Sequence, residues 1–220
     1  CGLSGGALLG FTVRTPWCNA RIDSLLAGRF NAFNLTVAIV ATASMGVSFA
    51  EIIEVTQQLK PVPGRLEPME MTSDITVVID YAHTPDALHR AITAVSEARH
   101  QGCIWVLFGC GGDRDRGKRS EMGAVATRLA DRIVVTSDNP RGEAPEAIIQ
   151  DILAGCEGAT PLVEVDRATA ISLVIAEAAA GDTVLIAGKG HETYQEIAGA
   201  RIPFSDVQCA NHYLAQRRAA

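Results

Sequence analysis

The sequence predicts an α/β protein in which a mostly parallel sheet flanked by helices follows a smaller α+β segment. Within the 220 residues, four short apolar runs between 75 and 187 alternate with longer amphipathic stretches, which is typical of a doubly wound sheet. Ahead of them, Pro61-Val62-Pro63-Gly64-Arg65 cannot continue a helix. We therefore expect residues 1–62 and 67–220 to form separate domains, joined by a hinge at 63–66.

The first segment begins with two alternating apolar stretches on either side of a turn at Pro16, which predict a pair of strands. These stretches are Leu9, Phe11 and Val13, then Ile22 and Leu25. A helical pattern follows from Asn34 to about Val47. Ser48 and Glu51 have the spacing of a capping box, so a second helix should begin there and end before Pro61.

The second segment contains the four apolar runs, 75–79, 104–108, 133–135 and 184–187, each short enough for a buried strand. Thr84 can cap a helix that has Pro85 in its first position. Three further amphipathic stretches predict helices over 117–130, 145–153 and 167–180. Ser205 and Gln208 form another capping box, which predicts a final helix.

Composition excludes several classes of protein. The net charge of −6 and isoelectric point near 5.4 disfavour a nucleic-acid or anionic-membrane partner, since such surfaces need excess Lys and Arg. No apolar run reaches the roughly 20 residues that span a bilayer, and we see no signal peptide. The six cysteines form no CxxC pair, so we expect reduced thiols, no bound metal and a cytoplasmic location.

Polar residues gather directly after the apolar runs, where the strands of an open α/β sheet form its ligand crevice. They occupy 80–86, 109–119, 137–141 and 188–192. Singly, Asp80 or His83 is more often a turn or cap residue, and Arg141 could be a solvated charge. Because all four loops should meet at one edge of the sheet, we expect them to share an anionic or zwitterionic ligand.

One of these loops imitates a phosphate-binding loop, because Gly112, Gly117 and Lys118 have the spacing of that motif. The motif requires a Ser or Thr directly after the lysine, whereas Arg119 stands there. Two aspartates in the loop would also repel phosphates. We therefore expect no ATP-phosphate cradle here, although the amides at the following helix start could attract a carboxylate.

Four motifs, taken together, resemble those of the Mur ligase family, and within it the ligases that add meso-diaminopimelate to a peptidoglycan precursor. They are Asp80-Tyr81-Ala82-His83-Thr84-Pro85, Gly111-Gly112-Asp113-Arg114-Asp115-Arg116-Gly117-Lys118-Arg119, Asp138-Asn139-Pro140-Arg141 and Gly188-Lys189-Gly190-His191-Glu192. The resemblance runs from about Gly28 to the last helix. It implies that 1–62 is the C-terminal remnant of a central ATP-binding domain and that 67–220 is a Rossmann-like amino-acid-binding domain.

The resemblance also assigns site residues. Asn31 and Asn34 match asparagines near the adenine of ATP, Arg65 and Asp80 match residues that hold its ribose and phosphates, and His83 is expected near them. The residues that match the diaminopimelate site are Arg114, Asp138, Asn139, Arg141, Gly188 and Glu192. Arginine can hold a carboxylate bidentately, while carboxylates and the Gly188 carbonyl can accept from an ammonium group. No catalytic nucleophile or metal ligand is implied.

The implied reaction is amide-bond formation. ATP, with Mg²⁺, activates the UDP-N-acetylmuramoyl dipeptide as an acyl phosphate, which the amine of meso-diaminopimelate attacks. The family's phosphate loop, magnesium-binding acids, carbamylated lysine and UDP-sugar site have no counterpart in these residues. We therefore expect the chain to position the amine, to be inactive alone, and to associate through apolar surface of 1–62.

Three alternatives remain open at this point: an L-lysine-adding ligase, a folylpolyglutamate-type ligase, and an amino-acid-binding module without catalysis. meso-Diaminopimelate has one more carboxylate than lysine and needs a cation for it. Arg141, directly after a turn stiffened by Pro140, can supply that cation, which favours diaminopimelate.

Overall fold

The computed structural model describes residues 9–16, 19–26, 28–69, 74–99 and 101–219. The chain divides into two compact units, Cys1–Val62 and Pro63–Ala220. Motion about the 63–66 segment, and the origin of the first unit in an ATP-binding domain, remain proposals. No helix within the described ranges is long and apolar enough to cross a membrane.

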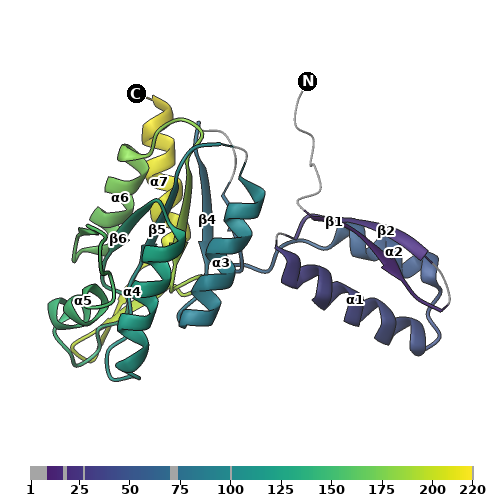
Figure 1. The fold of residues 1–220 in the computed structure, drawn as a ribbon, viewed down its shortest axis with the longest axis horizontal. Helices are drawn as coiled ribbons and strands as arrows, with labels where there is room; N and C mark the ends of the chain where they lie inside the picture. Colours follow the sequence, from purple (N-terminus) through teal and green to yellow (C-terminus); the bar gives the residue numbers. More distant parts are fainter. Residues whose placement is uncertain (1–8, 17–18, 27, 70–73, 100, 220) are drawn as a thin grey trace. The chain divides into compact units, whose positions relative to one another are not determined.

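The first unit packs one hairpin against two helices (Figure 1). Strands β1 (Leu9–Arg14) and β2 (Asn19–Ser24) pair antiparallel, as predicted. Helix α1 (Arg29–Ser44) begins five residues earlier than expected. It also ends earlier, because Gly46 at φ 91° turns the chain out of the helix. Helix α2 (Phe49–Gln58) starts at the predicted capping residue: Ser48 Oγ accepts from Glu51 N at 3.3 Å.

The second unit is built on a six-stranded sheet in the order β3-β4-β8-β5-β6-β7. All neighbouring strands are parallel except the edge strand β3. The predicted α/β fold with a mostly parallel sheet is therefore confirmed. The strands are β3 (Glu67–Pro68), β4 (Thr76–Asp80), β5 (Ile104–Phe108), β6 (Arg132–Val135), β7 (Leu162–Val163) and β8 (Thr183–Ala187).

Helices cover both faces of this sheet (Figure 1). Helices α3 (Pro85–Ala98), α4 (Gly117–Leu129) and α5 (Pro145–Leu153) pack side by side on one face. Helices α6 (Arg167–Glu177) and α7 (Asp206–Ala219) close a core of fully buried strand residues on the other. The capping residues Thr84 and Ser205 accept from backbone amides of the first turns of α3 and α7, as predicted.

Three features differ from or extend the sequence prediction. Helix α6 ends three residues before the expected position, because Asp182 accepts from the amide of Ala179 and holds the chain in a turn. The two-residue strands β3 and β7 were not predicted. A hairpin of β9 (Tyr194–Ile197) and β10 (Ala200–Pro203) was also missed, although it follows β8 directly.

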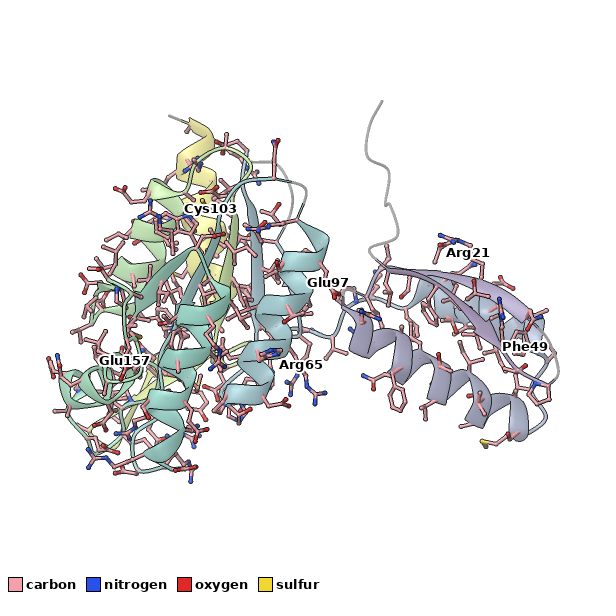
Figure 2. All side chains as sticks on the ribbon, in the orientation of Figure 1. Arg21, Phe49, Arg65, Glu97, Cys103 and Glu157 are labelled. Atoms are coloured by element: carbon pink, nitrogen blue, oxygen red, sulfur yellow. The ribbon has the colours of Figure 1, made fainter. Side chains whose placement is uncertain are left out.

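The carboxyl ends of the parallel strands define one end of the second unit. In Figure 2, Cys103, which precedes β5, lies toward the upper end of the sheet, and Arg65 lies toward the lower end, below which the strands lead into their polar loops. The described cysteines, Cys103, Cys110, Cys156 and Cys209, are free thiols. Cys1 and Cys18 lie outside the described residues, so the expectation of reduced thiols is met only for these four.

Candidate functional site

The loops that follow β4, β5, β6 and β8 enclose a cleft of about 430 Å³ at the carboxyl end of the sheet. All six residues that the sequence assigned to the amino-acid site line it, together with His83. The cleft is also lined by residues that were not assigned, which are Tyr81, Thr84, Gly111, Asp115 and Lys118. Lys189, which was not assigned either, is buried behind it. The topology thus gathers loops that are far apart in sequence into one site.

One wall of the cleft is a hydrogen-bonded group of Asn139, Lys189 and Glu192. Glu192 Oε2 accepts from Asn139 Nδ2 at 2.8 Å and from Lys189 Nζ at 2.9 Å. Burial acts to raise the pKa of Glu192, but these two hydrogen bonds and the positive charges of Lys189 and Arg141 outweigh it, so the pKa lies below its ordinary value. Glu192 is therefore an ionised acceptor at neutral pH.

Asp138 lies deeper in the same wall. Burial raises its pKa, and the nearby charges of Arg167 and Lys189 oppose that effect. Gly188 has φ 119°, and a Cβ there would lie 2.7 Å from Asp138 Oδ2. Only glycine therefore satisfies both the backbone conformation and the close approach of the carboxylate. Beneath the site, Arg167 is fully buried, pairs bidentately with Asp206, and donates to the Ala187 carbonyl at 2.9 Å.

Arg141 is fixed by contacts on both of its sides. Its backbone exchanges hydrogen bonds with the β9 strand, through Glu196 O and Ala198 N. Its Nη1 donates to Gly112 O at 2.8 Å, and its Nε lies 3.3 Å from Glu196 Oε2. The side chain of Arg141 keeps 23% of its surface exposed and lines the cleft, so it can still meet a ligand carboxylate.

The loop after β5 is organised by a buried arginine. Arg119 Nη2 and Nη1 bind Glu143 at 2.7 and 2.9 Å, Nη1 also binds Asp151 at 2.8 Å, and Nη2 donates to Gly111 O at 3.3 Å. Arg119, which stands where a phosphate-binding loop requires Ser or Thr, therefore has a structural role. Arg114 projects from this loop, exposed and lining the cleft.

The start of α4 does not offer all its amides to a ligand. Asp115 Oδ1 accepts from Gly117 N at 2.9 Å, so a side chain of the protein already occupies the first amide of the helix. The sequence left open a carboxylate site at this helix start. The structure corrects that expectation for the Gly117 amide, because Asp115 satisfies it.

The predicted nucleotide residues occupy different positions. Asp80 does not line the cleft: its carboxylate accepts from Leu66 N and Ala82 N, each at 2.8 Å, and its pKa is raised by burial. Arg65 lies over the Tyr81 ring, with Cζ 4.9 Å from the ring centre. The rings of His83 and Tyr81 pack edge to face, with their centres 4.7 Å apart.

Asn31 and Asn34 lie on α1 in the first unit, where Asn34 Nδ2 donates to Asn31 Oδ1 at 3.5 Å. Their predicted contact with adenine stays a proposal. Lys189 and Tyr81 belong to motifs that the sequence already singled out, so the signal that could have found them was their place between assigned residues. Lysine and tyrosine are usually exposed at least in part, which gave no reason to expect Lys189 to be buried.

Comparison with known proteins identifies the fold and the motifs. Residues 64–190 match the family described as "Mur ligase, glutamate ligase domain". The UDP-N-acetylmuramoyl-L-alanyl-D-glutamate--2,6-diaminopimelate ligase of Acidovorax sp. (strain JS42) is 49% identical over 96% of this chain and 43% of its own length. The protein with the same name from Chromobacterium violaceum is also 49% identical, over 94% of this chain and 42% of its own. The chain thus spans about two fifths of these relatives.

Solved structures agree. A structure of a UDP-N-acetylmuramoyl-L-alanyl-D-glutamate--2,6-diaminopimelate ligase superposes with a TM-score of 0.70 at 38% identity, covering 95% of this chain and 43% of that one. Folylpolyglutamate synthase of Mycobacterium tuberculosis gives a TM-score of 0.60 at 22% identity over 76% of this chain and 39% of its own, which is a likeness of fold alone. A family match over more than half of the residues, together with relatives of this identity, shows that the chain belongs to the Mur ligase family.

Proposed function

We propose that this chain supplies the amino-acid-binding part of a cytoplasmic, ATP-dependent ligase that adds meso-diaminopimelate to UDP-N-acetylmuramoyl-L-alanyl-D-glutamate. The names of relatives 49% identical to the chain support this reaction. The observation that carries the proposal is the charge pattern of the cleft. Arg114 and Arg141 line it together with Asp138 and Glu192, as a ligand with both carboxylate and ammonium groups requires.

Each charged group has a proposed partner on the amino acid. Arg114 and Arg141 bind carboxylates, since a guanidinium holds a carboxylate through two parallel hydrogen bonds. Glu192, Asp138 and the Gly188 carbonyl accept from an ammonium group, and Asn139 holds Glu192 in place at 2.8 Å. Holding one end of the amino acid this firmly would leave the other amine oriented toward its reaction partner. Such orientation can lower a barrier by several kcal/mol, and by about 7–11 kcal/mol in the most favourable cases.

ATP, when bound, would activate the substrate carboxyl as an acyl phosphate. We propose that Arg65, His83, Asn31 and Asn34 contact the nucleotide. Arg65 is a suitable group for this purpose, because it is exposed and its guanidinium, held 4.9 Å from the centre of the Tyr81 ring, can bind phosphate or stack on a base.

Asp80 is proposed to act on the nucleotide through the backbone of the segment that carries Arg65. Its two carboxylate oxygens accept from the amides of Leu66 and Ala82, and Leu66 has φ 40°. A non-glycine residue in that conformation needs outside support.

Mg²⁺ is proposed to accompany ATP in the complete reaction. Within the described ranges, no group of three His, Cys, Asp or Glu side chains converges as a metal site would require. None of the contacts proposed for this chain involves a metal ion.

The proposed binding of a carboxylate by Arg141 predicts that the cleft selects diaminopimelate over lysine. Arg141 is not left without partners when the cleft is empty, since it already binds Gly112 O and approaches Glu196. Lysine would therefore meet a smaller penalty than an arginine with no partner would impose, and we expect a preference of about 10- to 100-fold rather than the roughly 10⁴-fold of a site with orphaned groups.

Isothermal titration calorimetry of the 220-residue chain tests this proposal, with meso-diaminopimelate, L-lysine and L-glutamate as ligands. We expect wild type to prefer meso-diaminopimelate and Arg141→Ala to lose most of that preference. The control Arg128→Ala removes an exposed arginine of α4 that does not line the cleft, and it should change nothing. Equal binding of diaminopimelate and lysine by wild type would refute the assignment, and preference for L-glutamate would support the folylpolyglutamate-type alternative.

A further inference from the structure

We propose that Lys189 is a positioning residue that fixes both the charge and the orientation of the ammonium-binding wall of the cleft. The role of the wall in binding an ammonium group rests on the proposed function. Lys189 itself does not line the cleft. It acts through Glu192, Asn139 and Asp138, the residues with which its ammonium group is buried.

The first argument is burial. The side chain of Lys189 has no exposed surface, which is rare for lysine unless its charge is fully matched. Its Nζ lies 2.9 Å from Glu192 Oε2, 3.0 Å from Asn139 Oδ1 and 3.7 Å from Asp138 Oδ1. An ammonium group has three donors, and the acceptors that face it are all residues of the proposed ligand site. The buried ammonium group of Lys189 therefore interacts with the residues of the proposed ligand site and not with the hydrophobic core.

The second argument is charge. Asp138 and Glu192 are two carboxylates in one partly buried wall, and Lys189 is the cation bonded between them. When both carboxylates are ionised, Lys189 leaves the three groups with one net negative charge, which matches one ammonium group of a ligand. Without Lys189, two neighbouring carboxylates would repel each other, and the pKa of at least one of them would rise.

The third argument is orientation. Asn139 Oδ1 accepts from both Lys189 Nζ at 3.0 Å and Glu196 N at 2.9 Å, so Asn139 must present its Nδ2 to Glu192 Oε2. Lys189 binds that same Oε2. The other oxygen, Oε1, meets the Tyr81 hydroxyl at the longer distance of 3.5 Å. Lys189 thereby leaves Oε1 as the acceptor for a ligand ammonium.

Other charged groups near the wall do not replace Lys189. Arg167 is committed to a bidentate pair with Asp206, and Arg141 pairs with Glu196 at 3.3 Å. Another titratable neighbour of Glu192 is the Tyr81 hydroxyl, whose pKa is raised by burial and by the charges of Glu192 and Asp138. That hydroxyl stays neutral over the pH range of the test, so it adds no charge to the wall.

The test is a carbon-13 NMR titration of the Glu192 carboxyl in the 220-residue chain, assigned by its loss in Glu192→Gln. Wild type, Lys189→Met and Lys189→Gln are compared, and calorimetry with meso-diaminopimelate is repeated at one pH value below and one above the Glu192 pKa found in each variant. The control is Lys118→Met, which removes a lysine that lines the cleft but donates to His83 O. Removing Lys118 should leave the Glu192 titration unchanged.

We expect Glu192 of wild type to titrate below the ordinary glutamate value, and we expect its pKa to rise by one unit or more in both Lys189 variants. In these variants, affinity for meso-diaminopimelate should then fall as the pH is lowered through the raised pKa of Glu192, because each pH unit below a carboxyl pKa reduces the ionised fraction by about tenfold. Wild type should lack this dependence over that range.

Three outcomes would overturn the inference. These are a wild-type Glu192 that titrates at or above its ordinary value, folded Lys189 variants in which Glu192 titrates as in wild type, and a loss of affinity equal at both pH values. The wild-type titration needs no variant, so it decides the matter even if Lys189→Met and Lys189→Gln do not fold. Absence of any diaminopimelate binding by wild type would instead refute the proposed function, while the Glu192 titrations would still judge Lys189.

Discussion

Removing the buried guanidinium of Arg119 should destabilise the second unit and disorganise the loop that carries Arg114. Arg119 has no exposed side-chain surface and binds two carboxylates, those of Glu143 at 2.7 Å and Asp151 at 2.8 Å. Breaking a buried ion pair by removing one partner costs about 3–5 kcal/mol, chiefly because the remaining charge stays buried. The substitution Arg119→Met keeps much of the side chain's volume and removes only the charge and the hydrogen bonds.

Two features of the site reduce that cost. The side chains of Glu143 and Asp151 are 24% and 30% exposed, so water can partly solvate them after the change. Arg119 Nε has no hydrogen-bond partner within the described part of the chain, and its loss relieves a buried unsatisfied group. We therefore expect Arg119→Met to lower the free energy of unfolding by about 2–3 kcal/mol and Tm by roughly 5–10 °C.

Urea unfolding followed by the fluorescence of buried Trp105, in a Trp17→Phe background, measures this change in the second unit. The matched control is Arg116→Met, because Arg116 binds the same Asp151 at 3.0 Å but is 68% exposed. Such an exposed pair contributes about 0–1 kcal/mol. The reasoning would be refuted if Arg119→Met fell within about 0.5 kcal/mol of wild type, or if Arg116→Met were equally destabilising.

Three further predictions follow from the same contacts. Hydrogen bonds from Arg119 and from a backbone amide lower the pKa of Glu143 from 4.5 to about 2. The stability that the ionised Glu143 contributes is therefore fully present above pH 4.5 and is lost as the pH falls from there toward 2. Acid titration followed by circular dichroism should show a smaller loss of stability in Arg119→Met than in wild type. Gly123→Ala would force a Cβ against the carbonyl of Ile152 between α4 and α5, so thermal unfolding should show a loss of about 1–3 kcal/mol, and an unchanged Tm would contradict this packing. Val55 is 59% exposed and lines an apolar groove between α1 and α2. We expect this apolar surface to drive association of the chain, and we expect Val55→Glu to weaken that association in analytical ultracentrifugation. A wild-type chain that is monomeric at all concentrations would count against this prediction.

Much of the fold follows from local sequence. The buried strands β4, β5, β6 and β8 are short apolar runs, and the starts of α2, α3 and α7 follow from Ser48, Thr84 and Ser205, whose hydroxyls accept from nearby backbone amides. These signals are readable because each depends on residues within one turn or one strand. The two-residue strands β3 and β7 have no such signal, since only pairing with β4 or β6 makes them strands.

The candidate site was likewise predictable in part. The loops after the strands could be predicted, because the carboxyl ends of parallel strands meet at one edge, and the structure brings Arg114, Arg141 and Glu192 into one cleft. Their partners could not be predicted. An aspartate in such a loop is a common ligand contact, yet the carboxylate of Asp80 accepts a hydrogen bond from the backbone of Leu66, 14 residues away in sequence.

The amino-acid sequence by itself therefore determined the class of fold, the edge of the sheet that carries the site and the family of the chain. Tertiary structure decided which charges are buried and with what they pair. Lys189 meets Asn139 across a separation of 50 residues, and Arg119 meets Glu143 across 24. The physical reason is that a charged side chain in the sequence is indistinguishable from a solvated one until the fold supplies its counter-charge and removes its water.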